Sequence, residues 1–264
     1  NASLFGNTLF QSAGETVAYV MGPQGPVPFE GFGDSGIFLE QRRAFERIIN
    51  ANYGSVYERG FAEVQQRAVA AADRVSGAIA SAPELATSFP ASQLGEQLAT
   101  VARLIAVRDE LAMQRQIFFV AAGGFDTHDD QAQLQPGLLA GVSQAISAFH
   151  AATAELGVAD SVTTFTQSDF GRTLTSNGDG TDHGWGGIQL VVGDAVRGRE
   201  LYGEYPLLEI DGPRDVGGGR IIPSLSADQY AATLARWFGI PDGDLAQVAP
   251  HIDNFAERDL GFLL

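Results

Sequence analysis

The sequence contains no cysteine and no lysine. The absence of cysteine excludes disulfide bridges, thiolate metal ligands and cysteine nucleophiles together. The sequence also lacks any run of about 18 apolar residues, so we expect no segment that spans a membrane. Residues 1–4 carry neither a charged n-region nor an apolar h-region. We therefore expect no signal peptide within these residues.

Positive charge is scarce in this chain. Sixteen bases, all of them arginine, oppose 32 acids, which gives a formal net charge of -16. Binding to nucleic acid or to an anionic lipid surface requires a basic footprint, so we expect neither as a partner. An acidic surface favours solubility and, more weakly, attracts divalent cations.

The patterning predicts one α/β domain over residues 1–264 in three parts. Residues 1–33 are rich in glycine and proline and indicate an extended arm or a short hairpin. Residues 34–115 have helical periodicity and predict a helical layer. Gly54 and the stretch 83–90 divide this layer into three helices, the last over residues 92–107. Residues 116–264 predict the sheet core with its site loops.

The sheet core begins with a predicted strand–helix–strand unit. Residues 117–122 form a short apolar run that is typical of a strand buried on both faces, as in parallel sheets. A helix over residues 136–156 and a strand over residues 162–166 follow, with a right-handed crossover. A further strand at 188–192, a hairpin-like stretch at 198–222 and a capped helix at 226–238 complete the chain. We therefore expect a mostly parallel sheet between helical layers.

Polar residues that could bind a metal follow the two best-defined strands. Asp126 and His128 come after the first, and Asp169 comes after the second. Ligands bind outside the carboxyl ends of the strands in open α/β sheets. Residues two apart in an extended segment project to the same side, so Asp126 and His128 could share one cation.

A third candidate segment is the glycine-rich stretch 177–186, which contains Asp182 and His183. Carboxylates with one or two imidazoles suit zinc, manganese or a similar divalent ion; calcium is a further candidate. Arg172 could bind a tetrahedral anion with its guanidinium fork. Each residue also has a structural interpretation: a capping or turn role for the pairs, and a salt bridge for Arg172. The other two histidines, His150 and His251, suit packing and turn roles.

At these positions the sequence resembles the exported bacterial proteins of domain-of-unknown-function family 1501 (DUF1501). The resemblance is carried by three motifs, which are the segments 123–128, 168–173 and 180–186. Weaker matches extend it over essentially the whole chain. The family is similar to the alkaline phosphatase and sulfatase superfamily, which implies an alkaline phosphatase-like α/β fold with a metal centre at the strand ends.

The resemblance also implies what surrounds the site. Asp126 and His128 match one ligand cluster, and His183, with Asp182, would complete it. Phe170 stands where the superfamily has a second ligand histidine, which puts a second metal in doubt. The family's N-terminal portion, with its first strand and nucleophile region, is not in these residues. We therefore expect it as a separate chain bound to this one, or as a segment of the same precursor outside these residues.

Two functions follow as hypotheses. The first is a metal-dependent hydrolase of phosphate or sulfate esters, with Asp126, His128, Asp169, Asp182 and His183 as metal ligands and Arg172 steadying the anionic substrate. The second is a non-catalytic surface or assembly module with a structural cation site or none. The family carries twin-arginine export signals, so the resemblance implies a periplasmic or extracellular protein.

Overall fold

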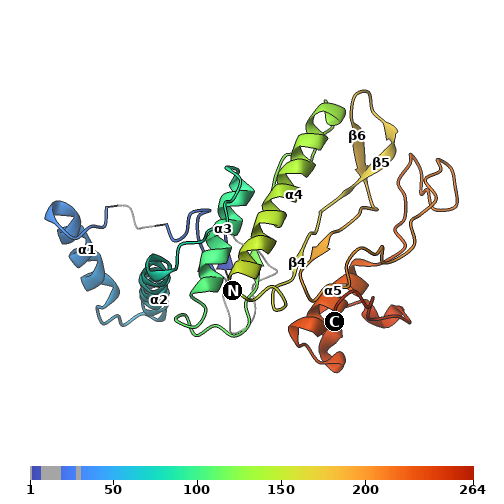
Figure 1. The fold of residues 1–264 in the computed structure, drawn as a ribbon. Helices are drawn as coiled ribbons and strands as arrows, with labels where there is room; N and C mark the ends of the chain where they lie inside the picture. Colours follow the sequence, from blue (N-terminus) through green and yellow to red (C-terminus); the bar gives the residue numbers. More distant parts are fainter. Residues whose placement is uncertain (1, 7–18, 28–30) are drawn as a thin grey trace. The chain divides into compact units, whose positions relative to one another are not determined.

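A computed structural model describes residues 2–6, 19–27 and 31–264 (Figure 1). The chain divides into two compact units, each with its own internal packing. Unit 1 comprises residues 1–85 and 91–122, and unit 2 comprises residues 86–90 and 123–264. Helix accounts for about 41% of the residues and strand for about 10%. The expected mixed α/β class is therefore confirmed, with shorter strands than the apolar runs predicted.

Unit 1 contains the three predicted helices: α1 (Gly36–Ile49), α2 (Val56–Ser81) and α3 (Gln93–Ala106). Ser92 caps α3 by accepting a hydrogen bond from the backbone N–H of Gly95. Four apolar residues of α3 at helical spacing are buried, namely Leu98, Val101, Leu104 and Ile105. The 3.6-residue period thus located the buried face of this helix.

A small parallel sheet completes unit 1. It has the order β2-β1-β3, with β1 at Ala2–Ser3, β2 at Tyr19–Val20 and β3 at Phe118–Phe119. The buried amide of Gln97 on α3 donates to the carbonyl of Ala121 and accepts from its N–H, which fixes the chain just after β3. After β2 the chain makes a tight turn, in which Gly22 and Gly25 exchange two backbone hydrogen bonds. Part of the predicted arm (7–18 and 28–30) lies outside the described residues.

The main part of unit 2, residues 123–264, begins with the loop before α4 (Gln131–Glu155). The sequence placed the start of this helix at Pro136, but it begins five residues earlier. The backbone N–H of Gln131 donates to the carbonyl of Asp179, and this bond fixes the start of the helix. Pro136 lies inside the helix, where its missing N–H leaves one carbonyl of the preceding turn without its usual partner.

The strands of unit 2 pair antiparallel. The two pairs are β4 (Thr164–Phe165) with β7 (Val191–Val192), and β5 (Gly171–Ser176) with β6 (Thr181–Gly184). The predicted parallel unit of residues 117–122 and 162–166 is therefore wrong, because β3 and β4 bond to different partners. Among the described residues the parallel sheet has three strands, and neither the larger parallel sheet nor the alkaline phosphatase-like fold is confirmed.

The C-terminal part of unit 2 is organised around α5 (Ala227–Phe238). Ser226 and Gln229 form the predicted capping box, and Gly239 ends the helix in the left-handed conformation at φ 104°. A small core joins α5 to the short helix α6 (Leu245–Val248) and the 3-10 turn at Ile252–Asn254. In the described ranges no helix combines the length and apolar character needed to cross a membrane.

Glu155, at the end of α4, holds the short segment 86–87 of the same unit. Its carboxylate accepts hydrogen bonds from the backbone N–H groups of Ala86 (2.6 Å) and Thr87 (2.9 Å) and from the hydroxyl of Thr87 (2.6 Å). The hydroxyl bond, followed by the two backbone bonds, lowers the pKa of Glu155. The ionised carboxylate of Glu155 therefore stabilises the folded state above the usual carboxyl pKa. This stabilisation is lost as the pH falls through the lowered pKa of Glu155.

We expect Glu155→Gln to lower the free energy of unfolding at neutral pH, because the amide replaces a charged acceptor with a weaker one. The difference from wild type should shrink as the pH falls into the acid range. Urea unfolding at pH 7 and at several acid pH values measures it. Glu200→Gln, an exposed residue of the same unit, is the matched control. A difference that stays constant with pH would contradict this account of Glu155.

Candidate metal centre

Asp126 and His128 lie in the loop that leads into α4. The residue between them, Thr127, is only 4% exposed. The backbone N–H of His128 donates to the carbonyl of Asp126 at 3.2 Å, so the chain makes a tight turn over Thr127, and the two flanking side chains meet at 3.0 Å as their spacing predicted. Burial of Thr127 thus fixes the direction in which both candidate ligands project.

His183 comes from the β5–β6 hairpin, where it pairs directly with Arg172. Residues opposite one another in an antiparallel pair project from the same face. Arg172 Nη2 lies 3.2 Å and His183 Nε2 lies 2.6 Å from Oδ1 of Asp126. The strand pairing thus places the guanidinium of Arg172 and the imidazole of His183 beside one carboxylate oxygen of Asp126.

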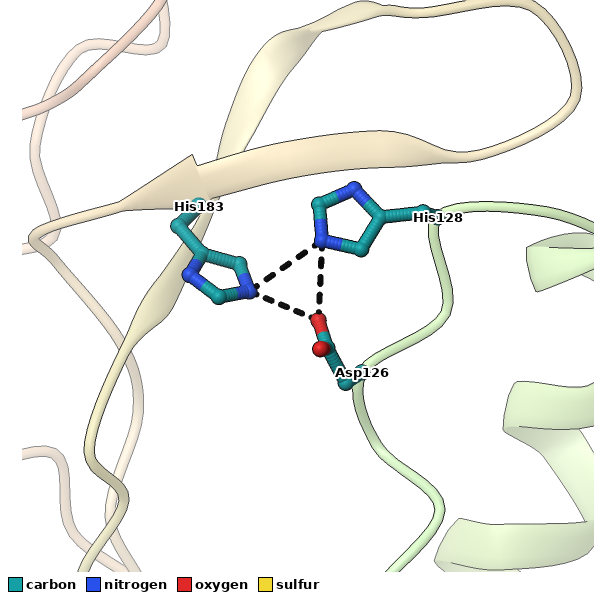
Figure 2. Close-up of side chains that lie close together, drawn as sticks. All are labelled: Asp126, His128 and His183. Atoms are coloured by element: carbon teal, nitrogen blue, oxygen red, sulfur yellow. Dashed lines mark hydrogen bonds and ion pairs between the residues drawn. The ribbon is translucent and has the colours of Figure 1, made fainter.

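Three donor atoms converge at this point, from Asp126, His128 and His183 (Figure 2). His128 Nε2 lies 3.0 Å from Asp126 Oδ1 and 3.3 Å from His183 Nε2. The side chains are 58%, 41% and 49% exposed in the order Asp126, His128 and His183. The cluster could hold a metal ion and is open to solvent on one side.

The charge state of Asp126 suits a metal ligand. The hydrogen bond from His183 lowers its pKa most. Desolvation, the next-largest effect, raises it, and the charges of His128, His183 and Arg172 lower it further, so that the pKa stays below its usual value. The carboxylate is therefore ionised at neutral pH. An ionised carboxylate and imidazole nitrogens are ligands that divalent transition metals accept.

The hairpin and the loop are held together by bonds outside the cluster. Arg172 donates through Nη1 to the carbonyl of Thr181 and through Nη2 to that of Phe125, both at 2.6 Å. The Thr181 hydroxyl donates to the side chain of Gln131 at 2.8 Å. At Gly180 the two segments are so close that a Cβ atom would collide with the carbonyl of His128. Only glycine fits there.

The other predicted ligands are placed differently. Asp182 lies beside His128, with Oδ1 3.4 Å from Nδ1, the ring nitrogen that is not directed at the cluster. Asp169 is exposed, and no hydrogen bond or ion pair in the described part of the chain joins it to the three donor atoms. His150 pairs with Asp194 at 2.9 Å, away from the cluster. The structure thus brings together three of the five residues predicted as ligands.

The β5–β6 hairpin and the contact of Phe170 were not predicted from the sequence. The ring of Phe170 stacks on that of His183, with centroids 4.0 Å apart and planes 12° from parallel. The sequence predicted no strand between residues 166 and 188. The signal for the hairpin is Asn177-Gly178, because Asn-Gly between alternating segments is a strong hairpin signature.

Comparison with models of protein families gives a match. The family model described as "Protein of unknown function (DUF1501)" matches residues 38–239, about three quarters of the chain. The chain belongs to the DUF1501 family. The DUF1501 match includes the loop with Asp126 and His128 and the hairpin with His183. Neither a curated protein nor a solved structure matches the chain.

We expect Gly180→Ala to weaken the join between the hairpin and the loop. The added methyl group must push the His128 carbonyl away, and such overpacking costs about 1–3 kcal/mol. Gly141→Ala in α4, where a Cβ meets nothing within 4 Å, is the control. It should stabilise unit 2 by about 0.5–1 kcal/mol, because alanine is the better helix former. Chemical unfolding of both variants measures this, and equal stabilities would contradict it.

Proposed function

We propose that this DUF1501 chain carries a metal-dependent hydrolytic centre for phosphate or sulfate esters, with one divalent ion held by Asp126, His128 and His183. The observation that carries the proposal is the convergence of three donor atoms whose side chains remain partly exposed. Structural metal sites are usually closed by four protein ligands, whereas catalytic sites keep a position open for water or substrate. The cluster of Asp126, His128 and His183 offers three protein ligands and is partly exposed, as in a catalytic site.

The spacing of the donors favours a small ion. For ligands about 2.0–2.1 Å from a tetrahedral zinc ion, neighbouring donor atoms lie about 3.3 Å apart. The pairs in the cluster are separated by 2.6, 3.0 and 3.3 Å, so slight opening admits such an ion. Calcium takes six to eight oxygen ligands at longer distances. Two imidazoles therefore favour zinc or manganese over calcium.

Such an ion would polarise an ester oxygen and lower the pKa of a bound water. Arg172 has five N–H donors, and its bonds to Thr181, Phe125 and Asp126 use three of them. Its side chain is 16% exposed. The proposed contact with an anionic ester would therefore use only the remaining N–H groups, while the rest of the guanidinium holds the site together.

Three hydroxyl groups within the motifs already donate hydrogen bonds, and one of them is that of Thr181, which donates to Gln131. Ser168 donates to the carbonyl of Phe170 and Thr173 donates to that of Thr175. The proposed nucleophile is accordingly a water at the ion, or a residue from the preceding segment that the family resemblance implies. The same resemblance supports an alkaline phosphatase-like setting and a location outside the cytoplasm.

Metal analysis tests the proposal. Purified wild-type protein reloaded with zinc or manganese should retain about one ion per chain, and His183→Ala should lose it, because ion binding depends on the ligand set. His150→Ala is the matched control, since His150 pairs with Asp194 outside the cluster. It should bind metal like wild type.

Activity is measured separately on panels of aryl phosphate and aryl sulfate esters. The reloaded wild-type protein should hydrolyse at least one class, and His183→Ala should lose at least 100-fold in kcat/KM. If the protein is tested together with the proposed preceding segment and binds metal but hydrolyses neither ester class, the cluster is a structural cation site instead. A wild-type protein that cannot retain a divalent ion would contradict both the centre and the hydrolase.

A further inference from the structure

Each of the three donors has a second neighbour, and all three neighbours come from one hairpin region. Arg172 contacts Asp126 at 3.2 Å. The carboxylate of Asp182 lies 3.4 Å from Nδ1 of His128. The ring of Phe170 stacks on His183 at 4.0 Å. These neighbours lie within residues 170–182, the hairpin with its flanking residue, and none of them is among the three converging donors.

We propose that Phe170, Arg172 and Asp182 are positioning residues, each of which orients one ligand of the metal site. This inference rests on the metal centre of the proposed function, but not on hydrolysis. It gives Asp182 a role beside the cluster in place of the predicted role as a ligand. It gives Arg172 a structural role within the site in addition to any contact with an anion.

Asp182 acts on His128 through the ring nitrogen that points away from the cluster. A neutral imidazole can bind a metal through Nε2 only when its proton is on Nδ1, and a carboxylate beside Nδ1 favours that tautomer. At 3.4 Å the contact is longer than a hydrogen bond of 2.7–3.2 Å, so in this structure the carboxylate faces Nδ1 without a close hydrogen bond to it. Asn177 Nδ2 donates to the same oxygen of Asp182 at 3.1 Å and restrains it.

Phe170 acts on His183 by stacking. The nearly parallel rings restrict rotation of the imidazole about its side-chain bonds and cover one of its faces. The guanidinium carbon of Arg172 lies 4.9 Å from the centre of the Phe170 ring. Phe170 therefore contacts both residues that approach Asp126 from the hairpin.

Arg172 acts on Asp126 while it bonds the two segments together. Its bonds to the carbonyls of Phe125 and Thr181 span from the loop to the hairpin. The carboxylate of Asp126 is thus held at a fixed distance from His183. Lysine could keep the charge at this position but not the fork that makes both carbonyl bonds.

The test measures Zn²⁺ affinity by competition with a chromophoric chelator, and the visible spectrum of the Co²⁺-loaded protein. Asp182→Asn and Phe170→Leu should each weaken Zn²⁺ binding about 10- to 100-fold, the usual effect of losing an orienting contact. Their Co²⁺ spectra should differ from wild type, and the metal-free melting temperatures should stay within a few degrees. Phe170→Tyr keeps the stacking ring and should restore wild-type affinity.

The matched controls carry the same chemical changes outside these contacts. Asp179→Asn removes a carboxylate from the tip of the same hairpin, and Phe165→Leu removes a ring that contacts Tyr230. Both should bind Zn²⁺ within about twofold of wild type. Arg172→Lys should weaken Zn²⁺ binding and alter the Co²⁺ spectrum in the same way as the other two positioning variants.

The outcomes separate the two proposals. Wild-type affinity and Co²⁺ spectra in Asp182→Asn and Phe170→Leu would overturn the positioning roles and leave the metal centre intact. If these variants bind Zn²⁺ more weakly but have an unchanged Co²⁺ spectrum and a lowered melting temperature, the substituted residues only stabilise the fold. That result would also overturn the inference. A wild-type protein that binds neither Zn²⁺ nor Co²⁺ would overturn the metal centre and the positioning roles together.

Discussion

One carboxylate oxygen, Oδ1 of Asp126, is the point on which the candidate site depends. The distances to this oxygen are 2.6 Å from His183 Nε2, 3.0 Å from His128 Nε2 and 3.2 Å from Arg172 Nη2. Two imidazoles and a guanidinium therefore meet at one anionic atom. In the metal-free state this convergence satisfies the carboxylate and lowers its pKa. A divalent ion at the same point would be bound by this oxygen and by the two imidazole nitrogens that face it.

Local sequence features were enough to predict the long helices α1 to α5, apart from the start of α4, and two of the candidate ligands. The periodicity of α3, the capping box of Ser226 and Gln229, and the position of Gly239 depend on interactions within a few residues. The spacing of two residues that brings Asp126 and His128 together is equally local. The association of His183 with them was inferred from its glycine-rich setting and from the family resemblance, and the structure confirms that the three residues converge.

Interactions between distant segments were not predictable in the same way. Strand pairing decides whether a sheet is parallel, and two-residue strands such as β3 and β4 contain too little pattern to specify a partner. The start of α4 depends on a bond from Gln131 to the carbonyl of Asp179 in the hairpin. The roles of Asp182 and Phe170 depend on the ring orientation of two histidines. Asp169 was predicted as a ligand from its place after a strand, but no contact in the described residues brings it to the cluster.

X-ray absorption at the zinc edge of the zinc-loaded protein tests the central claim most directly, because it counts the imidazoles bound to the ion. The account predicts two imidazole ligands per zinc, with oxygen from Asp126 and solvent completing the shell at about 2.0–2.1 Å. Replacement of His128 or His183 by alanine should reduce the count to one. A spectrum of bound zinc with no imidazole, or one unchanged by either replacement, would show that the ion binds elsewhere and would contradict the account.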